Sequence, residues 1–439
     1  MSLFHTSRPE PGRTTQEPFA PGTGGSRNFR IPAMVTLADG TLVAACDARW
    51  DHTGDGGGLD TIVSRSQDGG STWRYSFPNY LGDNGNTLNV LSTCFIDPAL
   101  ATDGQNLWML VDLYPAGIAL NTARYSPVPG SSGFDARGNL LLRSRDPLPM
   151  GEEGYAQAAA KAEYDYYLDR QTLKLHRRNG EDVPGYVVDG FFNITGPDGS
   201  CTNLFCADSP FRPWPTGFLN LTHSADGGRT WSAPQLLDLK RPEEQALLVG
   251  PGTGAYHNEN GHLLFAAYEH THGFERCSLL WRDAGGCWHR SANATLDTWS
   301  SEGAPVVLDD GTVRVFYRDG FEVLRYTDYR FDGKDYVITA REVETAAPKT
   351  ARNQLSAIRV GSRIYVSTAT GKNQQRTGGV IHVFSLEEAG TMMLLHTYSI
   401  TDGSYSYSCL TAPAAGELAL LYESGPGQIS FCRLPSLVP

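Results

Sequence analysis

The stretch SRSQDGGSTW at Ser64–Trp73 recurs almost unchanged as LTHSADGGRTW at Leu221–Trp231. Both copies follow the pattern Ser-x-Asp-x-Gly-x-Thr-Trp. In this pattern the aspartate can accept backbone N–H groups within a tight turn, and the glycine can adopt the positive φ that the turn requires. We expect each tryptophan to fold back and pack beneath a sheet. A repeated turn indicates a repeated structural unit, and we expect no catalytic role for either aspartate.

The sequence around these turns is typical of an all-β protein. A third, weaker copy of the turn, WRDAGGCW at Trp281–Trp288, keeps the aspartate, one glycine and the final tryptophan. Short apolar runs joined by Asp-Gly turns, as in Ala33–Arg49 and Ala304–Gly320, predict β-hairpins. Many short strands with a repeated turn favour a β-propeller over a sandwich or a barrel.

The segment between the two clear copies interrupts this rhythm. Gly151–Leu168 is Ala-rich and predicts a helix, and Thr172–Phe192 predicts paired strands. We interpret residues 115–211 as a small, mainly-β subdomain inserted into a propeller, with an elaborated blade as the alternative. The predicted organisation is an N-terminal extension (residues 1–28), a first propeller part (29–114), the insert, and a second propeller part (212–439).

Composition excludes several classes of function. The net charge of −12 over 439 residues argues against a surface for nucleic acid or anionic membranes. An anionic ligand would therefore need a local cluster of cations. The sequence has no run of 18 apolar residues that could span a membrane. Its eight cysteines form no CxxC pair, so we expect free thiols, no metal site and no cofactor. We expect a monomer.

The segment NFRIPAMVTLADGTLVAACDARWDHTGDGGGLD at Asn28–Asp60, taken with the repeated turns, resembles the bacterial sialidases (exo-α-sialidases, or neuraminidases). The resemblance extends from Phe29 to about Cys432. It is strongest to the pneumococcal-type form with an inserted subdomain, which includes intramolecular trans-sialidases. It implies a six-bladed β-propeller that releases terminal α-linked sialic acid from glycans, glycoproteins or glycolipids. The N-terminus lacks a signal-peptide pattern, so we expect a protein of the cell interior or one whose leader is absent here.

The resemblance also implies the residues that bind the substrate. Three arginines would hold the carboxylate of sialic acid, and two further residues would line the pocket near the sugar. A guanidinium binds a carboxylate through two parallel hydrogen bonds and stays charged at any working pH. The three arginines are Arg30, Arg318 and Arg376, and the two further residues are Arg49 and Asp97.

The catalytic residues follow from the same resemblance. Tyr407 would be the nucleophile, Glu302 its base and Asp55 the acid and base for the departing group. Sialidases with a tyrosine nucleophile are a known exception among retaining glycosidases. A neutral phenol avoids repulsion from the substrate carboxylate, but it needs a base within hydrogen-bond reach. Asp51 and Asp60 flank Asp55 and are the alternatives for its role.

Two other outcomes stay open from the sequence. The same site could transfer the sugar to its own hydroxyl, giving an anhydro product, or eliminate it to an unsaturated one. A non-catalytic, glycan-binding propeller would be expected to lack at least one of Tyr407, Glu302 and Asp55, and all three are present. The linkage preference and the role of the insert are not predicted by the residues.

Overall fold

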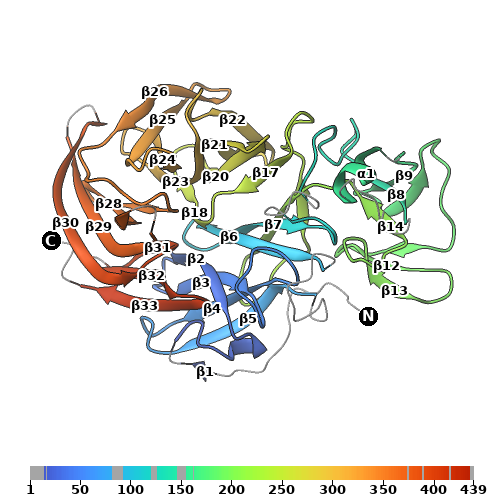
Figure 1. Ribbon diagram of the computed structural model, residues 1–439, viewed down its shortest axis with the longest axis horizontal. Helices are drawn as coiled ribbons and strands as arrows, with labels where there is room; N and C mark the ends of the chain where they lie inside the picture. Colours follow the sequence, from blue (N-terminus) through green and yellow to red (C-terminus); the bar gives the residue numbers. More distant parts are fainter. Residues whose placement is uncertain are drawn as a thin grey trace.

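The computed structural model describes residues 14–15, 17–81, 92–119, 126–145, 155–161, 163–372, 375–387, 390–414 and 417–435. Six β-sheets follow one another around a ring in chain order, from the blue sheet to the red one in Figure 1. The predicted six-bladed β-propeller is therefore confirmed. Within the described ranges, no helix has the length and apolar character needed to cross a lipid bilayer.

The first three blades are built mainly from antiparallel strands. Blade one consists of β1 (Thr14–Thr15), β2 (Phe29–Thr36), β3 (Leu42–Ala48), β4 (Asp60–Ser66) and β5 (Trp73–Asn79). Blade two consists of β6 (Cys94–Thr102), β7 (Leu107–Tyr114), β15 (Phe218–Ser224), β16 (Gln235–Leu237) and β18 (Gly252–Thr253). Blade three consists of β17 (Ala246–Val249), β19 (Ala255–His257), β20 (His262–Thr271), β21 (Phe274–Arg282) and β22 (Trp288–Asn293).

The last three blades complete the ring. Blade four consists of β23 (Ser300–Val307), β24 (Val313–Asp319), β25 (Arg325–Phe331) and β26 (Tyr336–Glu344). Blade five consists of β27 (Ser356–Val360), β28 (Arg363–Ala369), β29 (Thr377–Leu386) and β30 (Met392–Ser404). Blade six consists of β31 (Ser408–Ala414), β32 (Glu417–Gly425) and β33 (Gln428–Leu434). Blade six meets blade one through the hydroxyls of Thr36 and Thr411, which lie 2.8 Å apart.

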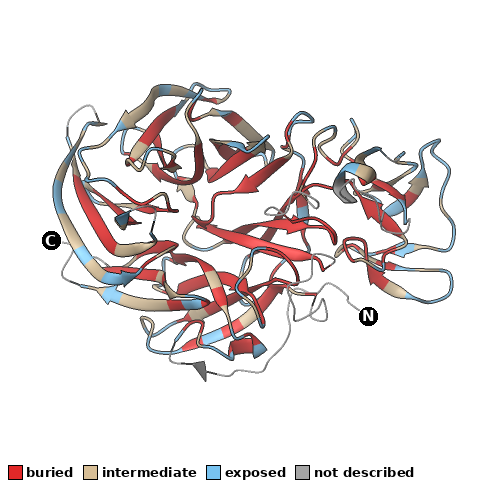
Figure 2. Cartoon of the chain, viewed as in Figure 1, coloured by how far each residue is buried: buried red, intermediate tan, exposed pale blue. Residues whose placement is uncertain are grey.

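Strand alternation explains how the blades hold together. On β3, Val43 and Ala45 pack toward blade two, whereas Leu42 and Ala44 pack toward blade six. A strand whose two faces are both covered reads as a continuous apolar run, as β3 does, because successive side chains point to opposite faces. Figure 2 shows the same pattern around the ring, with buried residues running through the blades.

The repeated turns have the predicted geometry. The Asp68 carboxylate accepts the Thr72 N–H at 2.8 Å, and Gly70 has a φ of 91°. The Trp73 indole N–H donates to the Gly70 carbonyl at 3.0 Å, and its buried ring packs on Phe431 of blade six. In the second copy the Asp226 carboxylate likewise accepts the Thr230 N–H at 2.9 Å and Gly228 has a φ of 81°, but the buried Trp231 indole N–H does not make the bond that Trp73 makes. In the weaker third copy the left-handed residue is Gly286.

The segment of chain that connects β7 to β15 forms two further sheets, which lie beside the ring (Figure 1). One contains β8 (Leu140–Ser144), β9 (Tyr166–Asp169), β10 (Lys174–Arg177) and β14 (Phe211–Pro213). The other contains β11 (Val187–Val188), β12 (Asn193–Thr195) and β13 (Cys201–Asn203). The remaining elements are the short helix α1 (Tyr155–Lys161) and the 3₁₀ turn η1 (Thr23–Gly25).

The helix predicted over Gly151–Leu168 is only partly present. Residues 151–154 and 162 lie outside the described residues, α1 ends at Lys161, and Tyr166–Asp169 forms strand β9. Aromatic residues favour strands, and β9 gains partners on both sides in β8 and β10. Tertiary pairing therefore overrides the helical tendency of the Ala-rich stretch. All eight cysteines are free, and Cys287 is exposed.

Candidate active site

A hollow of about 270 Å³ opens where the blades converge, and six of the eight predicted site residues line it. Ligand sites have volumes from about 300 Å³ upward, so this hollow suits one sugar rather than a chain of sugars. Its lining comes from five blades and the loops between strands. The lining residues are Ile31, Asp55, Ile96, Asp97, Tyr268, His270, Glu275, Trp299, Ser301, Glu302, Arg318, Arg352, Arg376 and Tyr407.

Irregular strand pairing directs several of these side chains into the hollow. The pairing of β2 with β3 shifts between Arg30 and Ala33, and Ile31 has a φ of 60°. The pairing of β6 with β7 shifts in the same way around Asp97, whose φ is 63°. A third shift surrounds Glu302 on β23. Bulges re-aim side chains, and positive φ in non-glycine residues is typical of functional sites.

Tyr407 and Glu302 form a buried pair at the floor of the hollow. The Tyr407 hydroxyl donates a short hydrogen bond to Glu302 Oε1, and Arg318 donates to Glu302 Oε2 at 2.9 Å. Burial raises the pKa of the Tyr407 phenol well above its ordinary value, and the Glu302 carboxylate raises it further. At neutral pH this tyrosine is therefore a neutral phenol whose proton already points at a carboxylate.

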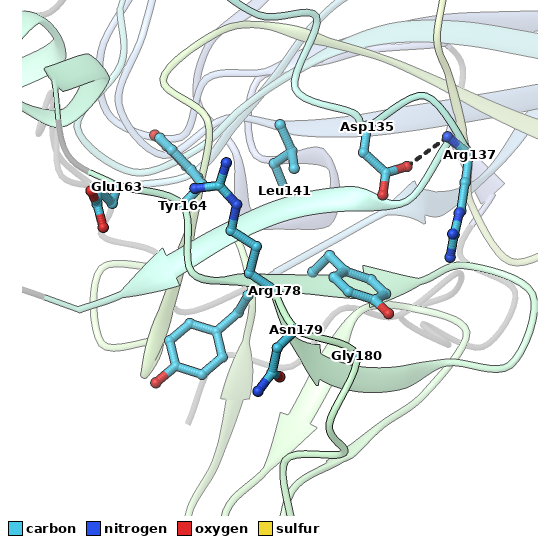
Figure 3. A pocket seen from close by; sticks show the side chains of 10 residues that line it. Asp135, Arg137, Leu141, Glu163, Tyr164, Arg178, Asn179 and Gly180 are labelled. Atoms are coloured by element: carbon cyan, nitrogen blue, oxygen red, sulfur yellow. Dashed lines mark hydrogen bonds between the residues drawn. The ribbon is translucent and has the colours of Figure 1, made fainter.

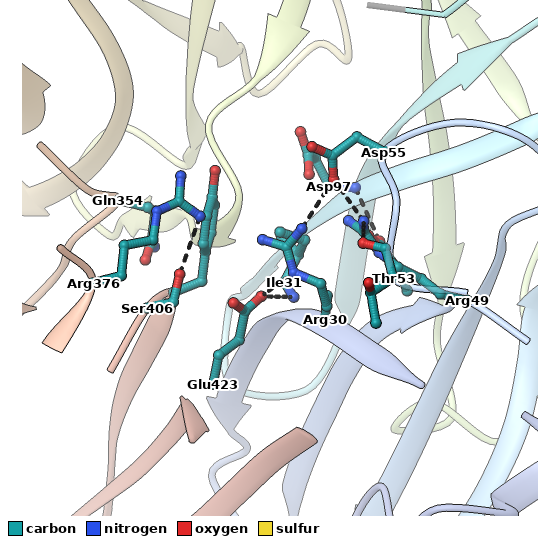
Figure 4. Close-up of polar contacts among 12 residues, drawn as sticks. Arg30, Ile31, Arg49, Thr53, Asp55, Asp97, Gln354, Arg376, Ser406 and Glu423 are labelled. Atoms are coloured by element: carbon teal, nitrogen blue, oxygen red, sulfur yellow. Dashed lines mark hydrogen bonds and ion pairs between the residues drawn. The ribbon is translucent and has the colours of Figure 1, made fainter. Parts of the chain in front are cut away.

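The three predicted arginines converge on this pair. The Arg30 and Arg376 Cζ atoms lie 5.7 Å and 5.3 Å from the centre of the Tyr407 ring. Arg318 lies beside the same pair, because its guanidinium binds the Glu302 carboxylate. In Figure 4, Arg30 and Arg376 point into one space, and Arg376 donates to the Ser406 hydroxyl at 3.2 Å. Such a cluster can hold a carboxylate despite the negative charge of the whole chain.

Glu423 supports the cluster from below. Its Oε1 accepts from Arg30 Nε at 3.1 Å and from the Ile31 backbone N–H at 2.9 Å. The carboxylate thereby fixes the Arg30 guanidinium and the left-handed residue beside it. The sequence places this glutamate shortly after Tyr407, in LLYE, but its position in the motif does not indicate a bond to Arg30.

Asp55 lies at the mouth of the hollow on the loop between β3 and β4. Its Oδ1 accepts from Arg30 at 3.0 Å and from Arg49 at 2.6 Å. Burial raises the pKa of the Asp55 carboxyl, but the Arg49 and Arg30 guanidiniums lower it by more, so the pKa ends below its ordinary value. Of the alternatives, Asp51 is exposed, and Asp60 is buried with Trp50 and the Leu81 N–H as partners. Neither of them lines the hollow.

The two other predicted pocket residues differ in their surroundings. Asp97 lines the hollow, and burial raises the pKa of its carboxyl well above its ordinary value, with Asp47 and Asp112 raising it further. A neutral carboxylic acid can donate a hydrogen bond to a hydroxyl or carbonyl oxygen. Arg49 does not line the hollow, because its guanidinium lies fully buried beneath the Asp55 loop.

The sequence reasoning missed several lining residues on the side of blades three and four. The Arg352 Cζ atom lies 3.8 Å from the centre of the Trp299 ring, and His270 pairs with Glu275 at 3.3 Å. Tyr268 also lines the hollow, and burial raises the pKa of its phenol well above its ordinary value. These residues belong to no repeated phrase, and the Arg352–Trp299 contact joins segments far apart in the chain.

The described residues also line other hollows, two of which bear on the site's boundaries. One of about 300 Å³ shares Arg30 and Arg376 with the site and extends along Thr53, Ser406 and Pro426. Another of about 640 Å³ lies on the sheet of β8, β9 and β10, where Arg137, Tyr164 and Arg178 border it (Figure 3). None of the predicted site residues lines the larger hollow. Across the described ranges, no group of three or more His, Cys, Asp or Glu side chains could hold a metal ion.

Among known proteins, the sequence relatives described below are all named as sialidases or as an anhydrosialidase. No protein-family model matches the sequence. Anhydrosialidase of Macrobdella decora is 25% identical over 91% of this chain and 58% of its own length. Sialidase B of Streptococcus pneumoniae serotype 4 is 27% identical over 66% of this chain and 45% of its own length. The chain thus spans about half the length of the curated relatives it matches.

Solved structures show the same likeness over nearly the whole chain. An intramolecular trans-sialidase from Ruminococcus gnavus, in complex with oseltamivir carboxylate, has a TM-score of 0.79 and 25% identity, covering 95% of this chain and 96% of that one. The leech intramolecular trans-sialidase, in complex with 2,7-anhydro-Neu5Ac, has a TM-score of 0.80 at 24% identity, covering 95% and 70% of the two chains. Taken together, the sequence relatives, the propeller and the repeated turns make the chain similar to sialidases over nearly its whole length.

Proposed function

We propose that this protein is a retaining exo-α-sialidase, which cleaves terminal α-linked sialic acid from glycoconjugates through a covalent glycosyl-tyrosine intermediate. One observation carries the proposal: a neutral phenol, Tyr407, donates to the Glu302 carboxylate within a cluster of three arginines. A nucleophile of this kind needs an adjacent base and a substrate that is itself anionic. Glu302 supplies the base, and sialic acid, which carries a carboxylate on its anomeric carbon, is such an anionic substrate.

The first half of the reaction forms the intermediate. The substrate carboxylate binds Arg30, Arg318 and Arg376, which places the anomeric carbon above Tyr407. The Tyr407 oxygen attacks that carbon and passes its proton to Glu302. The bond to the departing glycan breaks at the same time, and Asp55 gives its proton to the leaving oxygen.

The second half releases the sugar. Asp55, now a carboxylate, accepts a proton from water, whose oxygen attacks the anomeric carbon. The bond to Tyr407 breaks, and the phenol regains its proton from Glu302. Two displacements at one carbon retain the configuration. Asp97, as a neutral acid at the side of the hollow, can donate to an oxygen of the bound sugar.

Substrate binding also prepares Asp55 for its role as an acid. In the unliganded site Arg30 and Arg49 share one oxygen of this carboxylate, which favours the ionised form. A substrate carboxylate that binds Arg30 competes with Asp55 for it and adds a negative charge nearby. Both changes raise the pKa of Asp55 and favour its protonation.

Intramolecular transfer is the second candidate function. It is supported by the likeness to Anhydrosialidase and to two structures named as intramolecular trans-sialidases. In that reaction a hydroxyl of the bound sugar, rather than water, attacks the anomeric carbon and breaks the bond to Tyr407. The same residues serve both outcomes, so they differ only in which oxygen reaches the intermediate.

One experiment tests both candidates. The purified protein is incubated with a fluorogenic aryl sialoside, with Tyr407→Phe as the control, and the released sugar is identified by mass spectrometry. Free sialic acid supports hydrolysis, whereas a product lighter by one water supports intramolecular transfer or elimination, which fragmentation separates. Equal signals from wild type and Tyr407→Phe would refute catalysis by this site and favour a glycan-binding propeller.

We further propose that residues 115–211 form an inserted subdomain between the two propeller parts, 29–114 and 212–439, with residues 1–28 as an extension. The pairing of β7 with β15 across this segment, with two separate sheets between them, supports the division. Replacing the segment by a short linker should leave a folded propeller. Loss of the propeller's cooperative unfolding would contradict these boundaries.

A further inference from the structure

Arg49 occupies an unusual position for a residue predicted to contact the substrate. Its side chain has no exposed surface. Nε and one terminal nitrogen donate to Asp47 Oδ2 at 3.2 Å and 2.8 Å. The other terminal nitrogen, Nη1, contacts the Thr53 and Gly54 carbonyls at 3.0 Å and 2.9 Å and Asp55 Oδ1 at 2.6 Å. One guanidinium thus joins a buried carboxylate to three successive residues of the Asp55 loop (Figure 4).

The loop has little stiffness of its own. It continues from Asp55 into three glycines, and Gly56 and Gly57 have φ values of 117° and 84°. Glycine populates many backbone conformations with similar energy, so a run of glycines holds no single shape without outside contacts. The carbonyl bonds from Arg49 supply such contacts immediately before Asp55.

We call the Asp47–Arg49 pair, with its bonds to the Asp55 loop, the brace. Its Asp47 end is also held by several contacts. Asp47 lies on β3, is fully buried, and accepts the Asp97 backbone N–H on its second oxygen at 3.1 Å. Asp97 is the left-handed residue at the β6 bulge, and it lines the hollow from blade two. The Asp47–Arg49 pair therefore ties two walls of the hollow to one strand in the core of blade one.

We propose that Arg49 is a positioning residue, which with Asp47 sets the place of the Asp55 carboxyl relative to Tyr407. This rests on the proposed function, in which Asp55 protonates the departing glycan. A guanidinium suits the task because its planar fork can bond in two directions at once, which a lysine ammonium on a flexible stem cannot reproduce. Arg49→Lys therefore keeps the charge and removes the brace.

If Arg49 positions the Asp55 acid, the loss of kcat/KM in an Arg49 variant should depend on the leaving group of the substrate. An aryl sialoside departs as a weakly basic phenolate and needs little protonation, whereas a sialyl-lactose departs as an alkoxide and needs a well-placed acid. Arg49→Lys should lower kcat/KM for sialyl-lactose by about 10²-fold, but for the aryl sialoside by less than about tenfold. Asp55→Asn gives the reference pattern for loss of the acid.

Arg376→Lys is the matched control, because Arg376 is a predicted carboxylate ligand that contacts neither Asp47 nor the loop carbonyls. Both substrates carry the same carboxylate, so this variant should lower kcat/KM equally for the two. Asp47→Asn weakens the other end of the brace and should reproduce the Arg49→Lys pattern. It also serves as the second variant where Arg49→Lys fails to fold.

Hydrogen–deuterium exchange of residues 51–59 supplies a readout that does not depend on activity. Exchange there should rise in Arg49→Lys and Asp47→Asn but not in Arg376→Lys. Equal losses on both substrates with unchanged exchange would overturn the proposal and point to direct substrate contact. Unchanged kinetics and exchange would overturn it as well. An inactive wild type whose loop exchange still rises in Arg49→Lys would refute the proposed function while leaving the brace supported.

Discussion

Replacement of Gly379 by alanine should disturb Tyr407, the proposed nucleophile, without contacting it directly. Gly379 is buried on β29, and an added Cβ would lie within 2.5 Å of Tyr405 Cε2 and closer still to the ring atoms beside it. An ordinary van der Waals contact begins near 3.4 Å, so the ring or the strand must shift by about 1 Å. Gly379 has no left-handed φ, so steric overlap is the only penalty.

The surrounding contacts of Tyr405 prevent its ring from moving away from an added Cβ. Its ring is fully buried and stacked on Tyr422 with the ring centres 4.9 Å apart, and its hydroxyl makes a short hydrogen bond to Ser367. Overpacking of this kind costs about 1–3 kcal/mol of folding free energy. Tyr405 is also two residues from Tyr407, and its N–H donates to the Arg376 carbonyl at 2.9 Å. A shift of about 1 Å transmitted to these groups can lower kcat/KM by about 10²-fold.

The assay combines thermal unfolding with kinetics on an aryl sialoside. Gly403→Ala is the control, because Gly403 is exposed, has no left-handed φ, and its Cβ would meet only the Thr401 hydroxyl oxygen at 3.4 Å. We expect Gly379→Ala to unfold at a lower temperature and to lose activity while still folded, and Gly403→Ala to match wild type. A Gly379→Ala protein with wild-type stability and kcat/KM would refute the packing argument.

Two further predictions concern carboxyl groups. Glu302→Gln removes the proton acceptor of Tyr407 while keeping its shape, so kcat should fall by about 10²–10⁴-fold with a smaller change in KM; an unchanged kcat would exclude Glu302 as the base. Asp68→Asn should alter the pH dependence of stability, because the Thr72 hydroxyl and N–H and the Ser66 hydroxyl lower the pKa of Asp68 to about 2. The ionised carboxylate stabilises the fold above the unfolded-state pKa of about 4, and this contribution is lost as the pH falls toward 2. Urea unfolding from about pH 6 to about pH 2 should therefore show the difference between wild type and Asp68→Asn shrinking below about pH 4, and a constant difference would contradict it.

The turns could be predicted from the sequence because their interactions are local. Asp68 bonds to residues two and four positions away, and Trp73 bonds back to Gly70. All the partners lie within one short phrase, so the phrase determines the geometry. The number of blades is less accessible, because most of the blades carry no such phrase, and the resemblance to the sialidases supplied it.

The convergence of the site residues could be expected only through that resemblance. Arg30 and Glu423 are 393 positions apart, and no local pattern links them. The stacking of Arg352 on Trp299 also joins separate segments, and each residue alone resembles an ordinary surface group. The strand bulges at Ile31 and Asp97 could not be predicted from the sequence either. Neither residue type favours positive φ strongly enough to predict it.

Charge balance explains how a crowded set of cations stays folded and still attracts an anion. Arg30 is paired with Glu423 and Asp55, and Arg318 with Glu302, so the repulsion between these two arginines is offset within the protein. Arg376 differs, since it forms no ion pair with any of the described residues and instead contacts the Ser406 hydroxyl and the Tyr407 ring, neither of which carries a negative charge. Its positive charge is therefore the least neutralised of the three. A substrate carboxylate gains most by approaching Arg376 first, and it reaches Arg30 only by competing with Asp55. Under the proposed function, that competition couples binding of the anion to protonation of Asp55, and it would tie efficient cleavage to sugars that carry a carboxylate.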